Sequence, residues 1–199
     1  MPTPATNDNT QPMIFFDLDG VLSDFDRWAT EQGKLKPNGA VNWNALDYNW
    51  WVTMPPTPGA KDAYDTAWKL GRVMFLTAAS LDSGSFSGKV DWVKKFVPEA
   101  GSRIVETLVI APSADKALLA APNRILIDDR QSNIDAWNAA GGMGIHHTGD
   151  FKQTLAELQA AVAKIKAAAP NAAPATPPVQ PTVTPPAKIV GKFNAALKM

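Results

Sequence analysis

Residues 13–25 read MIFFDLDGVLSDF, a short apolar run that leads straight into acidic residues. Asp17 follows the run directly, Asp19 and Asp24 come soon after, and Gly20 lies between them. An apolar run of this length with a polar boundary is typical of a strand buried on both faces of a sheet. Carboxylates this close together repel one another unless a cation neutralises them. The stretch therefore predicts a buried strand that ends at a metal site.

Outward from this stretch, the chain alternates between strand-like and helix-like segments. A helix is expected from about Leu22, before an aromatic-rich, irregular region. Further strands are predicted over 72–76, 106–110, 124–127 and 144–147, and helices over 60–71, 89–97, 113–120, 132–142 and from about 150. Strands that alternate with helices indicate an α/β fold whose parallel sheet is flanked by helices.

Polar side chains follow three of the predicted strands. Asp17, Thr77 and Asp128 each come directly after a strand, and Asp129 adjoins Asp128. Ligands of open parallel sheets bind outside the carboxyl ends of the strands, so these residues should meet at one edge. Oxygen ligands without His or Cys favour a hard ion, and Mg²⁺ fits best. In the alternative interpretation, these acids only mark the starts of helices. That could explain one acidic pair, but it explains less readily why two pairs each follow a strand.

Lys116 is expected in the first turn of a helix, where the helix dipole disfavours a cation. Beside a metal and a phosphate, a lysine has a use, because it pairs with anionic oxygens and orients the nucleophile.

Four segments of the chain resemble the motifs of a known family. DLDGVLSDF, FLTAAS, DKALL and ILIDDRQSNIDAW resemble, in the right order, the four motifs of the haloacid dehalogenase (HAD) superfamily, over residues 13–149. PPTPGAKDA, DWVKKF, ADK and LIDDR extend the resemblance to the 5'(3')-deoxyribonucleotidase family. The resemblance implies a Rossmann-like core with a small helical cap inserted after the first motif. It also implies hydrolysis of (deoxy)nucleoside monophosphates to nucleoside and phosphate.

Carried over to the matching residues, the resemblance implies a role for each. Asp17 would be the nucleophile that forms an aspartyl-phosphate, and Asp19 the general acid and then base. Thr77, the amide of Ala78 and Lys116 would hold the phosphoryl oxygens.

Mg²⁺ would be bound by Asp17, by the backbone carbonyl of Asp19 and by the pair Asp128–Asp129, whose two members the sequence does not separate. Gly20 would let the loop turn at the phosphate.

The aromatic residues of the expected cap suggest how a nucleobase is chosen. Phe25 matches an aromatic that contacts the base in the related family, and Trp50 and Trp51 are expected as further walls. In the alternative interpretation, at least half of the cap aromatics form its own core; these are Phe25, Trp28, Trp43, Tyr48, Trp50 and Trp51. The expected cap is shorter than in the animal enzymes. Ala78 stands where the family usually has Ser, which leaves the sugar and the 5' or 3' preference open.

Three further groups have plainer interpretations. Arg130 matches an arginine of some family members. The sequence leaves open whether it contacts the substrate or pairs with a nearby acid. Asp24 is interpreted as a structural acid. His146 and His147 adjoin on a predicted strand, so their side chains should point to opposite faces and serve structure.

Domain organisation follows from composition. We expect a disordered arm over 1–12, one phosphatase domain over 13–166 with its cap at about 24–56, and a Pro/Ala-rich linker over 167–187. A short amphipathic helix over 188–199 could dock to a protein partner or fold back on the domain. An interaction module that acts through this tail, and a phosphatase for another small phosphomonoester such as a sugar phosphate, are the alternative functions.

The overall composition excludes several classes. The chain has 19 basic and 19 acidic residues, which argues against a nucleic acid polymer or a membrane surface as partner. No apolar run approaches the roughly 20 residues that a membrane helix needs. With 0 cysteines, thiolate nucleophiles and cysteine zinc sites are excluded. A cytoplasmic enzyme with a small-molecule nucleotide substrate is expected, and the sequence leaves a homodimer open.

Overall fold

The computed structural model describes residues 11–168. The expected N-terminal arm up to residue 10, and the linker and terminal helix from residue 169 on, lie outside the described residues.

Within residues 11–168, the sheet has five strands, all parallel, in the order β3-β2-β1-β4-β5. They are β1 Met13–Phe16, β2 Arg72–Thr77, β3 Leu108–Ile110, β4 Arg124–Asp128 and β5 Met143–His146. At the centre, Phe16 of β1 pairs with Phe75 on one side and Ile127 on the other. The chain runs outward from β1 to β3 and then returns to β4, so the order of the strands reverses beside β1. Ligand sites of parallel sheets form at the carboxyl ends of such neighbouring strands.

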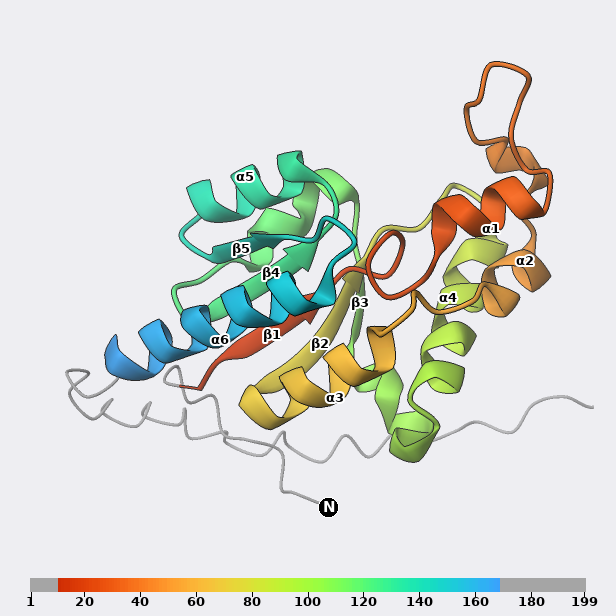
Figure 1. Ribbon diagram of the computed structural model, residues 1–199. Coiled ribbons are helices and arrows are strands. Elements are labelled where there is room, and N and C mark those ends of the chain that lie inside the picture. The colour runs from red at the N-terminus through yellow and green to blue at the C-terminus, as the bar shows by residue number, and fades with distance from the viewer. Residues whose placement is uncertain (1–10, 169–199) are drawn as a thin grey trace, which may run out of the picture.

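Helices cover both faces of the sheet (Figure 1). They are α1 Phe25–Glu31, η1 Trp43–Ala45, α2 Tyr48–Thr53, α3 Ala60–Leu70, α4 Ser83–Phe96, η2 Pro98–Thr107, η3 Ser113–Leu119, α5 Gln131–Ala139 and α6 Phe151–Ala168, where η marks a 3-10 helix. Residues of α3, α4 and α6 join one apolar cluster, and residues of α5 join the other. The predicted Rossmann-like α/β fold is therefore confirmed.

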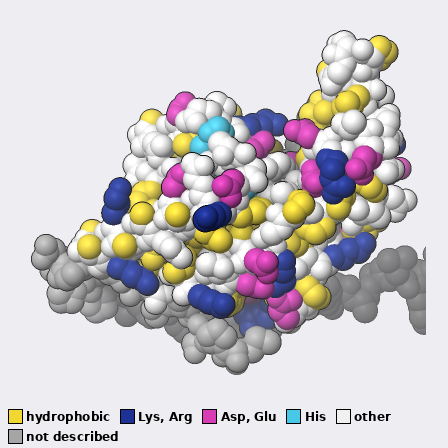
Figure 2. Space-filling view, viewed as in Figure 1, with side chains coloured by type: hydrophobic (Ala, Val, Ile, Leu, Met, Phe, Trp, Pro, Cys, Tyr) yellow, Lys and Arg dark blue, Asp and Glu magenta, His cyan; other side chains and the backbone are white. Residues whose placement is uncertain are grey.

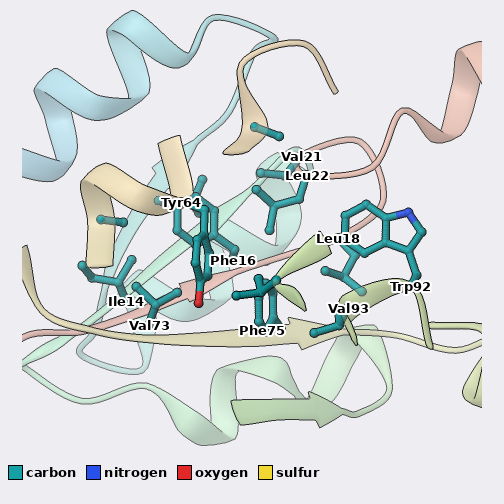
Figure 3. Close-up of a cluster of buried hydrophobic side chains, with 14 of the residues drawn as sticks. Ile14, Phe16, Leu18, Val21, Leu22, Tyr64, Val73, Phe75, Trp92 and Val93 are labelled. Atoms are coloured by element: carbon teal, nitrogen blue, oxygen red, sulfur yellow. The ribbon is translucent and has the colours of Figure 1, made fainter. Parts of the chain in front are cut away.

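Alternate residues of the strands supply the two cores. Ile14 and Phe16 face the α3–α6 side, whereas Phe15 faces α5, where it packs edge-on against Trp137. Figure 3 shows the first cluster, with Tyr64 of α3 lying on the strands. Its ring stacks on Phe75 with centroids 5.6 Å apart. Each large apolar side chain buried in this way contributes about 1.5–3 kcal/mol.

Some elements begin at other residues than the sequence predicts. Helix α1 begins at Phe25 and not near Leu22, because the preceding loop turns back so that the Ser23 amide donates to the Leu18 carbonyl at 2.8 Å. Helix α4 begins at Ser83, six residues before the predicted start, and Asp82 caps it. Strand β3 is only three residues long, since 3-10 turns occupy the residues before it.

Residues 24–56 form an insertion between β1 and α3, called the inserted segment below. It carries α1, η1 and α2, and it projects beyond the sheet in Figure 1. Two hydrogen bonds join helix α2 and its C-terminal end to α4. Tyr48 Oη donates to Asp91 Oδ2 at 2.8 Å, and Trp92 Nε1 donates to the Met54 carbonyl at 2.7 Å. This segment corresponds in position to the predicted cap, whose domain boundaries stay a prediction.

Basic and acidic side chains are interspersed on the face of the molecule that Figure 2 shows. Within residues 11–168, no helix combines the length and the apolar character that crossing a membrane requires.

Candidate active site

The carboxyl end of β1 places Asp17 in the middle of the sheet edge. Its backbone amide donates to the Ile127 carbonyl at 2.9 Å, which continues the ladder to β4 by one residue. The residue is 6% exposed, and Oδ1 accepts from the Leu18 amide at 2.8 Å. The strand pairing thus holds this carboxylate in one place, buried but open at one side.

Lys116 lies between two buried carboxylates. Its Nζ is 3.0 Å from Asp17 Oδ2 and 2.7 Å from Asp128 Oδ2. Although burial disfavours its charge, the two carboxylates raise the pKa of Lys116 above its usual value. Burial raises the pKa of Asp17 to about 7 against the opposing effect of Lys116, and the charge of Asp128 adds to the rise. The expected convergence of strand ends and lysine is therefore present.

The two acids after β4 have different surroundings. Asp128 is fully buried and already saturated, because Asn133 Nδ2 donates to both its oxygens at 2.9 and 3.0 Å and the Arg130 amide donates to Oδ1 at 3.0 Å. Among the residues that the structure describes, Asp129 Oδ1 is buried and has no hydrogen-bond partner. Burial, and then the charge of Asp128, raise the pKa of Asp129. Asp129 is thus the acid of the pair with an oxygen free for a ligand.

The acidic cluster fits a divalent cation. Asp17, Asp128 and Asp129 each offer a carboxylate oxygen, and these oxygens lie within 4.8 Å of one another. The donors are all oxygen, as hard cations prefer, and the unpartnered Asp129 oxygen needs a positive or donating group. The Asp19 side chain does not belong to this cluster of described residues, and the contribution expected from its backbone carbonyl stays a prediction.

Gly20 makes room for Asp129. It has a φ of +78°, and a Cβ at this position would lie 2.5 Å from Asp129 Oδ2. The glycine expected to turn the loop therefore also permits close approach of the second acid.

One lysine, Lys89, hydrogen-bonds to both Asp19 and Thr77. The sequence did not indicate it as functional. Lys89 of α4 donates to Asp19 Oδ2 at 2.5 Å and to Thr77 Oγ1 at 3.0 Å, and its side chain is 1% exposed. One signal could have found it. Lys89 stands on the same helical stripe as Trp92 and Val93, both buried, and a lysine on a buried stripe needs anionic or polar partners.

A cavity of ≈ 570 Å³ opens over these groups. Its wall combines the strand ends with the inserted segment, and it is lined by Asp17, Asp19, Trp43, Asn44, Leu46, Trp51, Thr77, Ala78, Ala79, Ser80, Leu81, Asp82, Ser113, Lys116 and Arg130. Seven of the residues predicted from sequence are thus brought together, namely Asp17, Asp19, Trp51, Thr77, Ala78, Lys116 and Arg130.

Two predicted base-contacting residues lie elsewhere. Phe25 is 8% exposed and Trp50 is 4% exposed, and neither is among the lining residues described. Their rings pack edge-on with centroids 5.3 Å apart, so they form the core of the inserted segment. Trp43, which the sequence did not single out, is 46% exposed and lines the cavity. Packing inside the segment, and not sequence spacing, selects which ring is free.

The remaining candidates have structural partners. Asp24 pairs with Arg27 at 2.6 Å at the start of α1. His146 Nε2 lies 2.8 Å from the Asp129 carbonyl, whereas His147 Nδ1 lies 2.9 Å from Thr154 Oγ1. The two rings have separate partners, as their structural interpretation predicts.

Ser113 also has a structural partner. Its hydroxyl donates to Asn133 Oδ1 at 3.1 Å. It therefore supports the residue that orients Asp128.

The fold and the site define an α/β protein with a buried acidic centre at the carboxyl edge of its sheet. No protein-family model and no curated protein matches the chain. A solved structure of an uncharacterized protein from Corynebacterium glutamicum is 15% identical, with a TM-score of 0.43 over 77% of this chain and 96% of that one. A hydrolase from Streptococcus pneumoniae is 14% identical, with a TM-score of 0.43 over 74% of this chain and 98% of that one. At this level of similarity neither structure carries an argument about function.

Proposed function

We propose that the protein is a Mg²⁺-dependent phosphatase of the haloacid dehalogenase type that hydrolyses (deoxy)nucleoside monophosphates. One observation carries the proposal. Buried Asp17, held 3.0 Å from Lys116, opens onto a cavity that also presents Asp19 and Thr77. A fixed carboxylate with a cation behind it and an acid beside it is what covalent phosphoryl transfer requires.

In the proposed first step, an Asp17 oxygen attacks the phosphorus and the bond from phosphorus to the ester oxygen breaks. Asp19 gives its proton to that oxygen, so the nucleoside leaves as an alcohol. Thr77, Lys116 and the Ala78 amide donate to the phosphoryl oxygens.

In the second step, Asp19 takes a proton from water, the water oxygen bonds to phosphorus, and Asp17 is released with inorganic phosphate. A bound Mg²⁺ would lower the repulsion between the anionic nucleophile and the anionic phosphate. Asp17 and Asp129 would hold the ion directly, and Asp128, already saturated by Lys116 and Asn133, would complete the negative charge of the site.

The cavity supports a nucleotide as substrate. Trp43, Trp51 and Leu46 give it apolar lining beside the acidic residues. A nucleobase that stacks on an aromatic ring gains about 1–3 kcal/mol. Since Trp43 is the partly exposed ring of this lining, it is the side chain proposed to stack on the base.

A substrate panel tests this function. The wild-type protein is assayed with Mg²⁺ on deoxyribonucleotides, ribonucleotides, sugar phosphates and an aryl phosphate, and kcat/KM should be highest for nucleotides. Trp43→Ala should raise KM for the nucleotide by roughly 5- to 150-fold, the factor equivalent to the stacking energy. Trp68→Ala, a half-exposed tryptophan of α3 that does not line the cavity, is the matched control and should leave KM unchanged.

The outcomes of the panel separate the alternatives. Good turnover of sugar phosphates without turnover of nucleotides would reject the nucleotidase part and favour a phosphatase for another small phosphomonoester. The tail-docking alternative concerns residues outside the described part of the chain, and truncation after residue 167 addresses it: unchanged activity and an unchanged set of co-purified proteins would count against it.

Mg²⁺ should stabilise the folded protein. At ten times its Kd, the ion adds about 1.4 kcal/mol by mass action, which corresponds to roughly 3–6 °C in Tm for a chain of this size. Gly20→Ala should abolish most of this gain, because the added methyl group displaces Asp129. The measurement is thermal unfolding with and without MgCl₂.

Gly39→Ala is the matched control. Gly39 has a φ of +80°, similar to that of Gly20, but no atom of the described part of the chain lies within 4 Å of a Cβ built there. Both variants should lose about 1–2 kcal/mol from the left-handed backbone conformation, and only Gly20→Ala should also lose its response to Mg²⁺. An equal response in both variants would contradict the assignment of Asp129 as a ligand.

A further inference from the structure

Lys89 is a buried cation beside the proposed chemistry, and it lies among two hydrogen-bond acceptors and an aromatic ring. Its Nζ donates to Asp19 Oδ2 and to Thr77 Oγ1, and it lies 4.7 Å from the centre of the Trp51 ring. An ammonium group has three N–H donors, and these three neighbours surround it. Because an unpaired buried charge is strongly unfavourable, this lysine stays in place only while its partners do.

Two glycines of α4 let the inserted segment close over Lys89. A Cβ at Gly88 would collide with the Trp51 side chain, and a Cβ at Gly84 would lie 2.9 Å from the Tyr48 amide nitrogen. The backbones of α4 and α2 can therefore come close together, which brings the ring of Trp51 over the ammonium group. Lys89 thus joins three parts of the structure: the loop after β1, the end of β2 and the inserted segment.

We propose that Lys89 is a positioning residue that orients both Asp19 and Thr77 for phosphoryl transfer, an inference that rests on the proposed phosphatase function. Among the described residues that line the cavity Lys89 does not appear, so it acts through its two partners and not on the substrate.

For Asp19 the effect is on orientation. Its side chain is 26% exposed, and its other side-chain hydrogen bond comes from Ser23 Oγ at a long 3.3 Å. Without Lys89, the Asp19 carboxyl group would be free to turn toward solvent. A displacement of about 1 Å at a reacting group can cost roughly 100-fold in rate.

For Thr77 the effect is on the direction of its proton. An ammonium group only donates, so Thr77 Oγ1 accepts from Lys89. The hydroxyl proton is then available for a phosphoryl oxygen, since its contact to the Ala78 carbonyl, at 3.4 Å, is long. One side chain thus sets the geometry of an acid from the first motif and a donor from the second.

The test is Lys89→Met, which keeps the length of the side chain and removes the donors. With an alkyl phosphomonoester such as a nucleotide, kcat should fall roughly 10- to 100-fold, part of the 10²- to 10⁴-fold that general acid–base catalysis supplies. KM should change less than about twofold, because Lys89 does not touch the substrate. Lys94→Met, on the exposed side of the same helix, should retain wild-type kcat.

Two readouts separate positioning from a merely structural role. With nitrophenyl phosphate the loss should be smaller, because nitrophenolate leaves without a proton from Asp19. In an Asp19→Asn background, Lys89→Met should cost less than about threefold more, because the part of its effect that acts through Asp19 is already lost and only the part that acts through Thr77 remains. Equal losses on both substrates, together with additive losses in the double variant, would overturn the proposal.

Circular dichroism and thermal unfolding establish that each variant is folded. If Lys89→Met alone fails to fold, the double variant with Asp19→Asn, which lacks both charges, is compared with Asp19→Asn, and a further tenfold loss would overturn the proposal. If the wild type hydrolyses phosphomonoesters and Lys89→Met keeps full kcat, only the role of Lys89 is rejected. If the wild type hydrolyses none, the phosphatase function and this role both fall.

Discussion

Asp17→Asn is expected to lower kcat for phosphomonoester hydrolysis by roughly 10⁴-fold or more, the scale of loss seen when a catalytic nucleophile is removed. The amide keeps the shape of the side chain but cannot form an aspartyl-phosphate. The fold should survive, because the substitution removes a buried carboxylate whose pKa burial has already raised to about 7. Steady-state kinetics with the best substrate of the panel, alongside thermal unfolding, measures both effects.

Asp24→Asn is the control in the same loop. Asp24 pairs with Arg27, and it does not belong to the acidic cluster of Asp17, Asp128 and Asp129. Its variant should keep kcat within about twofold, since exposed ion pairs contribute about 0–1 kcal/mol to stability and this pair has no catalytic role. An Asp17→Asn protein with more than a tenth of the wild-type kcat would reject covalent catalysis by Asp17.

Lys116→Met should produce the largest loss of stability, about 3–5 kcal/mol, which is the usual cost of removing one partner from a buried ion pair. For a chain of this size that corresponds to a fall in Tm of roughly 6–20 °C. The physical reason is that Asp17 and fully buried Asp128 would then face each other without the cation 3.0 and 2.7 Å away. Activity should be lost as well, because the phosphoryl oxygens lose a donor.

The loss should depend on pH in a definite direction. Lys116 lowers the pKa of Asp17 against the effect of burial, so its removal raises that pKa further above 7. An acid whose pKa is raised by folding destabilises the folded state increasingly as pH rises from its unfolded pKa, 3.8, through its folded pKa. The difference in unfolding free energy between wild type and Lys116→Met should therefore be larger at pH 8 than at pH 6, measured without divalent ions.

Lys94→Met is again the matched control, because Lys94 is an exposed lysine that pairs only with Asp91 at 2.9 Å among the described residues. Its unfolding free energy should stay within about 1 kcal/mol of wild type at both pH values. A Lys116→Met protein as stable as this control would show that the buried cation does not hold the two carboxylates.

The sheet and its polar edge could be predicted because their signals are local. The run that ends at Asp17 and the strand that ends at Asp128 are apolar on both faces, which only a covered central strand needs. Thr77 was placed by the same logic. The starts of α1 and α4 could not be predicted as well, because the loop after β1 and the Asp82 cap depend on hydrogen bonds that are absent from the apolar pattern.

The chemistry of individual acids required neighbours that are distant in the chain. Asp128 and Asp129 are adjacent and equivalent in sequence, but Asn133 and Lys116 saturate the first and leave an oxygen of the second unpartnered. Phe25 was expected at the substrate, but it packs into the inserted segment while Trp43 faces the cavity. Which aromatic ring is free depends on three-dimensional packing among several similar rings.

The residues of MIFFDLDGVLSDF were enough to predict a buried strand that delivers Asp17 and Asp19 to a charged edge, because the apolar run and the acids that repel one another are adjacent in the chain. Lys89 required the folded protein. It lies 70 residues from Asp19 and 12 from Thr77, and it reaches both only when the fold brings α4 against α2 and beside these two residues. A buried charge is defined by the groups around it, and those groups come together only when the whole chain has folded.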